Sequence, residues 1–202
     1  MIIGVSGRIG HGKDEVAKII QYLTFLETHK IEISYEQFEG STLEMLTNWN
    51  IKKMAGKLKE VAGMLLNVAP NKFEDREFKN SLLGPEWGGM SIRTFLQKLG
   101  TDAMRNGLHE HTWANAFWVN YTEKENWIIT DIRFPNEYES VKERGGIMIH
   151  VHRPTVARPV NEHESETALE GFHFDYHLIN DAGIEELIDL VKIVLRKEKI
   201  IK

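Results

Sequence analysis

The sequence has no cysteine, few prolines and no long apolar run, and each absence excludes a class of protein. Without cysteine the chain has neither a disulfide framework nor a thiolate metal site, which fits the reducing cytoplasm where we expect it to work. No apolar stretch reaches the roughly 20 residues that cross a bilayer, and the N-terminus lacks the basic region of a secretory signal. We therefore expect no membrane partner.

An excess of positive charge is missing too. The chain has 25 basic and 30 acidic residues, a net charge of −5, which argues against a protein whose main task is to bind nucleic acid. With 42% hydrophobic and 27% charged residues, the 202 residues have a globular composition and are enough to bury a sizeable core. At about 150 residues per domain, this length favours one domain with insertions, or at most two small domains. The net negative charge does not exclude a small anionic substrate, because a few local cations are enough to bind one.

Apolar runs alternate with helical patterns along the chain. Buried strands are predicted at 2–6, 51–53, 127–131, 147–152 and 176–179. Apolar residues at helical spacing predict helices over 16–26, 58–65, 92–103, 113–121 and 184–195. This alternation predicts a three-layer α/β/α fold with a central parallel sheet. Residues 28–50 alternate at first and then turn polar, so we expect an insertion there, and we expect the segment 71–89 to be rich in loops.

A glycine-rich loop follows the first predicted strand and opens the first predicted helix. Its match to G-x-x-x-x-G-K, in this context, favours a phosphate-binding loop over an incidental glycine turn. Lys13 would reach the β- and γ-phosphates of a nucleotide. Asp14 stands where a Ser or Thr is usual, and a carboxylate there can hold Mg²⁺ directly or through water. The residues expected to contact the phosphates are Gly7, Gly10, His11, Gly12, Lys13 and Asp14.

A second acid, Asp131, closes the strand predicted at 127–131. From that position an acid can reach a phosphate-bound Mg²⁺, although an acid there also commonly caps the next helix. Arg133 follows at the edge of the sheet where ligands bind in open α/β folds. Arg153 and Arg158 lie in a polar excursion that we interpret as a lid carrying cations over a transferring phosphoryl group.

The helix expected after Ser91 carries a polar stripe opposite its apolar face. Arg93, Gln97 and Thr101 are spaced four residues apart, and Arg105 lies one turn further. A guanidinium fork matches a phosphate and an amide matches a base edge, but a solvated helix face has the same pattern. Further cations that could join the stripe, or simply lie on the surface, are Lys57, Lys59, Arg76 and Lys79.

Histidines occur in pairs and beside acids, but no group has the spacing of a complete metal-ligand set. We therefore favour packing or surface roles for them over a zinc site. The groups concerned are His109 with His111, His150 with His152, and His163 with its neighbouring acids.

Together these motifs resemble the bacteriophage-type deoxynucleoside monophosphate kinases, members of the P-loop nucleoside monophosphate kinase group. The resemblance rests on the order and spacing of motifs at 7–14, 55–60, 75–79, 93–105, 131–137, 153–154 and 163–166. It implies a single P-loop domain over residues 1–202, with a helical acceptor-binding insertion at 35–112 and a lid at 153–172.

The resemblance implies transfer of the γ-phosphoryl group of ATP to a deoxynucleoside monophosphate, with Mg²⁺ as the metal and no nucleic-acid or membrane partner. A phage-encoded enzyme of this kind would work in the host cytoplasm. The residues implied to act on the transferring group are Lys13, Arg133, Arg153 and Arg158, and those implied to hold Mg²⁺ are Asp14 and Asp131. The residues implied to bind the acceptor are Lys57, Lys59, Lys79, Arg93, Gln97, Thr101, Arg105 and Asp131.

Two rival functions share the glycine loop. One is another P-loop small-molecule kinase, for example of the phosphomevalonate kinase type, which also needs a cationic acceptor pocket. The other is a nucleotide-regulated ATPase module, which would hydrolyse ATP without an acceptor. The sequence leaves open the accepted base, the preference for deoxyribose, and whether the chain acts as a monomer or a homodimer.

Overall fold

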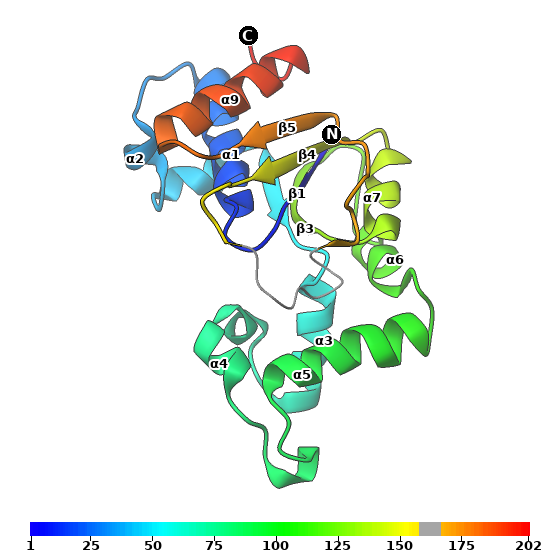
Figure 1. Cartoon of the computed structure of the whole chain (residues 1–202). Helices are drawn as coiled ribbons and strands as arrows, with labels where there is room; N and C mark the ends of the chain where they lie inside the picture. Colours follow the sequence, from blue (N-terminus) through cyan, green and yellow to red (C-terminus); the bar gives the residue numbers. More distant parts are fainter. Residues whose placement is uncertain (158–166) are drawn as a thin grey trace. The chain divides into compact units, whose positions relative to one another are not determined.

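The computed structural model describes residues 1–157 and 167–202, which form two compact units (Figure 1). Unit 1 comprises Met1–Lys53 and Thr122–Lys202, and unit 2 comprises Met54–Tyr121. Within these described ranges, no helix combines the length and the apolar character needed to cross a bilayer.

Unit 1 is built on a five-stranded, fully parallel sheet with the strand order β2-β3-β1-β4-β5. Its strands are β1 (Ile2–Ser6), β2 (Trp49–Lys52), β3 (Asn126–Ile132), β4 (Ile147–His152) and β5 (Tyr176–Ile179). All five predicted strands are present, and the second begins two residues earlier than predicted. Every residue of β1 is buried, as expected for a strand covered on both faces.

Helices cover both faces of this sheet (Figure 1). On one face, α1 (Lys13–His29) and α9 (Ile184–Lys197) pack apolar stripes, including Val16 and Val191, against Ile3 of β1. On the other face lies α7 (Pro135–Lys142), whose Val141 approaches Gly4 of β1. The three-layer α/β/α fold of a P-loop kinase is therefore confirmed. α7 was not predicted, although Pro135 in its first turn is a helix-start signal.

The predicted boundaries of the insertion, 35–112, differ from those of unit 2. Residues 35–53 belong to unit 1, because the short helix α2 (Tyr35–Phe38) buries its two aromatic side chains against α1. The ring centroids of Tyr35 and Tyr22 are 5.3 Å apart. Ser34 starts α2 with a capping box, accepting from the Gln37 N–H at 3.3 Å. At its other end, unit 2 extends to Tyr121.

Unit 2 is helical and has its own small core of Ala62, Phe73, Ile92 and Phe95. Its helices are α3 (Gly56–Leu66), α4 (Arg76–Asn80), α5 (Ile92–Gln97) and α6 (Thr112–Trp118). The predicted cap at Ser91 is confirmed, since its Oγ accepts from the Thr94 N–H at 3.1 Å. The described residues form 3₁₀ helices at Thr42–Leu46 in unit 1, and at Pro70–Glu74 and Pro85–Trp87 in unit 2.

The prediction of one continuous helix over 92–103 is wrong. After Gln97 the chain continues as a π-helical segment, η4 (Lys98–Asn106). The Trp113 indole of α6 donates to the Gly100 carbonyl of this segment at 2.9 Å. A π-helix closes its hydrogen bonds five residues apart rather than four, so the direction of the side chains changes where α5 meets η4.

Candidate active site

The glycine loop between β1 and α1 wraps closely against its neighbours. Gly7 and Gly12 adopt φ angles of 147° and 96°, which residues with a side chain rarely adopt. A Cβ on Gly7 would lie 2.3 Å from the Val151 carbonyl oxygen, and one on Gly12 would lie 2.5 Å from Nδ2 of Asn180. Both positions therefore require glycine, and α1 begins directly after the loop, with its positive end at the loop.

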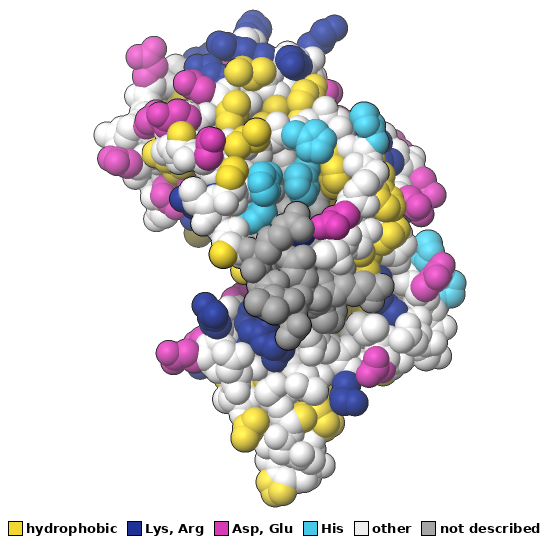
Figure 2. Space-filling view, viewed as in Figure 1, with side chains coloured by type: hydrophobic (Ala, Val, Ile, Leu, Met, Phe, Trp, Pro, Cys, Tyr) yellow, Lys and Arg dark blue, Asp and Glu magenta, His cyan; other side chains and the backbone are white. Residues whose placement is uncertain are grey.

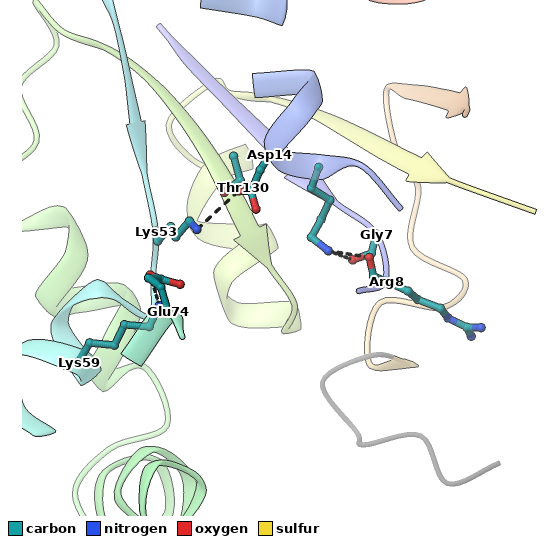
Figure 3. A network of polar contacts seen from close by, with 8 residues as sticks. Gly7, Arg8, Asp14, Lys53, Lys59, Glu74 and Thr130 are labelled. Atoms are coloured by element: carbon teal, nitrogen blue, oxygen red, sulfur yellow. Dashed lines mark hydrogen bonds and ion pairs between the residues drawn. The ribbon is translucent and has the colours of Figure 1, made fainter. Parts of the chain in front are cut away.

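Lys13, the first residue of α1, folds its side chain back over this loop. Its ammonium donates to the carbonyl of Gly7 at 2.5 Å and to that of Arg8 at 2.8 Å (Figure 3). The backbone carbonyls of Gly7 and Arg8 thus hold a cation at the loop. This is the arrangement that would meet the negative charge of a bound polyphosphate.

His11, another predicted phosphate contact, is tied into the fold by its side chain. The ring is buried, with Nδ1 3.2 Å from the Val151 carbonyl oxygen and its edge toward His152. Its carbonyl accepts from Nδ2 of Asn180 at 3.0 Å. These contacts tie Nδ1 of the imidazole and the backbone carbonyl of His11 to neighbouring strands and segments, and so help to fix the loop.

Asp14 sits beside Thr130 of β3 and Lys53, which follows β2. The Thr130 hydroxyl donates to Oδ1 of Asp14 at 2.8 Å, and Nζ of Lys53 lies 3.6 Å from the same oxygen (Figure 3). Thr130 is buried, whereas 68% of the Asp14 side chain is exposed. A carboxylate and a hydroxyl thus converge beside the loop.

Neither Lys53 nor Thr130 was among the predicted site residues. A weak signal existed for both, because they lie at the carboxyl ends of strands, where parallel sheets bind ligands. Nothing in the local sequence, however, indicates that both contact Asp14.

An irregularity in β3 bears on the predicted role of Asp131. Gly4 of β1 pairs with Ile129, whereas Ser6 pairs with Ile132, so Thr130 and Asp131 together oppose one residue of β1. Such a bulge interrupts the alternation of side chains between the two faces of a sheet. In a regular strand the side chains of Thr130 and Asp131 would point to opposite faces of the sheet. The bulge removes this requirement, so both side chains can lie on the same side.

The arginines predicted to act on the transferring group have different surroundings. Glu137 fixes the backbone at Arg133, accepting from its N–H at 2.9 Å. Arg153 is exposed directly after β4. Arg158, part of the predicted lid 153–172, and the residues 163–166 lie outside the described residues. From the described flank of that lid, Glu170 forms an ion pair of 2.6 Å with Arg8 of the glycine loop.

The predicted acceptor residues all lie in unit 2, except Asp131. Arg93 and Gln97 are exposed on α5, and Nε of Arg93 donates to Oδ1 of Asn80 at 3.2 Å. Thr101 and Arg105 lie on η4. The remaining lysines are Lys57, which pairs with Glu60 at 2.6 Å, Lys59, which pairs with Glu74 at 2.5 Å, and Lys79 in the last turn of α4.

A cavity of about 490 Å³ opens beside the glycine loop at the carboxyl ends of β1, β4 and β5. Histidines from the loop and from β4 and β5 line it, and Figure 2 shows histidine side chains gathered on this face. In the described parts of the chain, no three His, Asp or Glu side chains are arranged to hold a metal ion.

Burial is the main cause that lowers the pKa of His150 in this cavity from its ordinary 6.5 to about 4. His177, His11, His152 and Lys13 lower it further by repulsion. Between these two pH values the unfolded chain binds a proton at His150 that the folded chain does not, so stability falls as the pH falls.

We expect acidification from pH 7 to 4 to remove about 2 kcal/mol of unfolding free energy through His150, after allowing for partial exposure. Urea unfolding at pH 7 and pH 4 tests this in the wild type and in His150→Leu. The variant should lose less stability than the wild type. Equal losses in both proteins would contradict this role of His150.

Comparison with known proteins agrees with this geometry. The model of the family described as deoxynucleotide monophosphate kinase matches residues 34–191. The deoxynucleotide monophosphate kinase of Enterobacteria phage T4 is 28% identical over 189 residues, covering 81% of this chain and 76% of the relative. The deoxynucleoside-5'-monophosphate kinase of Escherichia phage T5 is 25% identical, covering 89% of both chains. A protein of Acanthamoeba polyphaga mimivirus is 27% identical, covering 92% of this chain and 91% of its own.

The family model begins after the glycine loop, so the loop and the model are independent indications. The first comes from backbone geometry at 7–14, and the second comes from residues 34–191. Because the match extends over most of the sequence and the fold is that of a P-loop kinase, the chain belongs to the deoxynucleotide monophosphate kinase family.

Proposed function

We propose that this enzyme transfers the γ-phosphoryl group of ATP to the α-phosphate of a deoxynucleoside monophosphate. An oxygen of the acceptor phosphate attacks the γ-phosphorus, the bond to the β–γ bridging oxygen breaks, and ADP leaves with the bond electrons. The observation that carries the proposal is the Lys13 ammonium held over the glycine cradle, beside the paired oxygens of Asp14 and Thr130. We place the enzyme in the cytoplasm, in keeping with its lack of cysteine.

The residues present fit a nucleotide and Mg²⁺. The cradle is closed to side chains at Gly7 and Gly12, which leaves the backbone to approach phosphate oxygens. Asp14 and Thr130 offer the carboxylate and hydroxyl oxygens that Mg²⁺ prefers, and Asp131 follows in the bulge. Mg²⁺, when bound, neutralises part of the phosphate charge. Lys53 would balance the charge of Asp14 from the other side.

Phosphoryl transfer between two phosphates needs positioning and charge neutralisation more than covalent chemistry. In this proposal Lys13 orients the β- and γ-phosphates, and Arg133, Arg153 and Arg158 supply further positive charge to the transferring group. Closure of the lid would exclude water, which is the competing acceptor.

We assign acceptor binding to unit 2. The Arg93 guanidinium, exposed on α5, would take the monophosphate, and the Gln97 amide one turn later would contact the base. Thr101, Arg105 and Lys79 would extend this surface. Lys57 and Lys59 form ion pairs with Glu60 and Glu74. They would therefore help to position the acceptor-binding side chains rather than bind the acceptor through their own ammonium groups.

Changing Asp14 to Ala should raise the Mg²⁺ concentration needed for half-maximal activity, since the carboxylate is lost from the proposed metal site. Asp14→Ser should have a milder effect, because a hydroxyl can replace one oxygen ligand. The measurement is a Mg²⁺ titration of activity at saturating ATP. An unchanged Mg²⁺ titration in both variants would show that Asp14 does not bind the metal and only contributes to the first turn of α1.

The function is tested by measuring ATP consumption against a panel of ribo- and deoxynucleoside monophosphates, with phosphomevalonate as an outgroup. The proposal expects little turnover until a deoxynucleoside monophosphate is added. Steady release of inorganic phosphate without an acceptor would indicate an ATPase module instead. Turnover with phosphomevalonate alone would indicate the other small-molecule kinase. Family membership favours neither rival.

A further inference from the structure

The cavity beside the glycine loop is lined in part by residues to which the proposed positioning of the phosphates gives no role. His150 of β4 reaches into it, and Nδ1 of this residue is buried without a hydrogen-bond partner among the described residues. A buried polar atom without a partner destabilises the fold, and such atoms are rare in native proteins. An imidazole retained there therefore indicates a ligand that supplies the missing partner.

The lining of the cavity is mixed in chemistry. It includes Gly7 and Arg8 of the glycine loop, where the phosphates are proposed to bind. It also includes the apolar side chains of Phe172, Phe174 and Leu178. The rings of Phe174 and His150 lie 4.9 Å apart. A matching ligand has phosphates at one end and a flat ring with a polar edge at the other, and about 490 Å³ is a typical volume for such a site.

We infer that His150 binds the base of the phosphate donor through a hydrogen bond to its Nδ1. This inference rests on the proposed function, because it places the triphosphate of the same nucleotide on the glycine loop. The flat base would lie against Phe172 and Phe174, with its polar edge toward the imidazole. His150 is then a residue that selects the base of the donor.

The protonation state of the imidazole suits this role. Burial keeps His150 neutral at pH 7, so one ring nitrogen donates and the other accepts. Nδ1 can then pair with an amino group or with a ring nitrogen of a base, depending on the tautomer. A protonated imidazole could only donate.

The inference is tested with two ligands that differ only at the base end. Calorimetric titration of the full chain with MgATP and with magnesium tripolyphosphate compares a whole donor with its phosphates alone. His150→Leu removes the hydrogen bond at similar volume. His150→Asn keeps a polar atom near the position of Nδ1. The matched control is His173→Leu, since His173 is exposed in the same segment as Phe172 and does not line the cavity.

We expect His150→Leu to weaken MgATP binding about 10-fold or more and to leave tripolyphosphate binding unchanged. His150→Asn should recover most of the lost affinity, and His173→Leu should bind as the wild type does. Equal MgATP affinity in the wild type and His150→Leu would overturn the inference, and so would a parallel loss for tripolyphosphate.

This test is separate from that of the proposed function, because binding is measured without an acceptor. A wild type that binds MgATP through His150 but transfers no phosphoryl group would refute the kinase proposal alone. A wild type that transfers the group and is indifferent to His150 would refute the inference alone.

Discussion

Replacing Lys13 with Ala should lower kcat about 10³-fold while the protein stays folded, which is the scale for losing one preorganised charge at a transferring group. The Lys13 ammonium is held over the loop by two carbonyls, so its removal deletes a positioned cation without opening the core. The measurement is steady-state kinetics at saturating Mg²⁺, with circular dichroism to check the fold.

The matched control for Lys13 is Lys18→Ala, on the same helix. Lys18 pairs with Glu39 at 2.7 Å, with both side chains partly exposed, and such pairs contribute at most about 1 kcal/mol to stability. Lys18→Ala should therefore keep normal turnover. Near-normal turnover in a folded Lys13→Ala variant would refute the assignment of the loop to the phosphates of ATP.

Replacing Arg93 with Ala should lower kcat/KM for the monophosphate. The expected increase in the corresponding activation free energy is about 1.5–3 kcal/mol, the value of a charge-assisted hydrogen bond. ATP affinity should hardly change, because we assign Arg93 to the acceptor and the glycine loop to ATP. The measurement is steady-state kinetics over the acceptor panel, with ATP binding measured without acceptor. Lys98→Ala, an exposed neighbour, serves as the control.

Gln97→Ala separates two roles for the amide on α5. If Gln97 reads the base, the loss in kcat/KM will differ among the four bases, and if it only orders the helix, all acceptors will suffer alike. Should Arg93→Ala weaken ATP binding as much as monophosphate use, or change neither, the predicted acceptor stripe is a solvated face.

The fold was predictable where short-range signals are strong. β1, the glycine loop and α1 follow from an apolar run, three glycines and a helical spacing of apolar residues. α2 was missed because four residues are too few to show a period, and only the capping box of Ser34 and Gln37 marks it. η4 was not predicted, and the hydrogen bond that Trp113 of α6 donates to Gly100 within it is a tertiary contact that the local sequence does not indicate.

The candidate site was predictable only in part, for a related reason. The loop residues occur in one continuous motif, whereas Lys53 and Thr130 reach Asp14 from two other strands. Their contacts depend on strand order, which the sequence alone does not specify. Likewise, the sequence does not show that Nδ1 of His150 is buried without a hydrogen-bond partner among the described residues, because this depends on the residues packed around it.

The most direct test of the account follows the label of γ-³²P-ATP in the presence of a deoxynucleoside monophosphate. The account predicts that the label appears in the deoxynucleoside diphosphate, with one ADP formed for each labelled product. Label released as inorganic phosphate, with no labelled diphosphate for any acceptor, would contradict it.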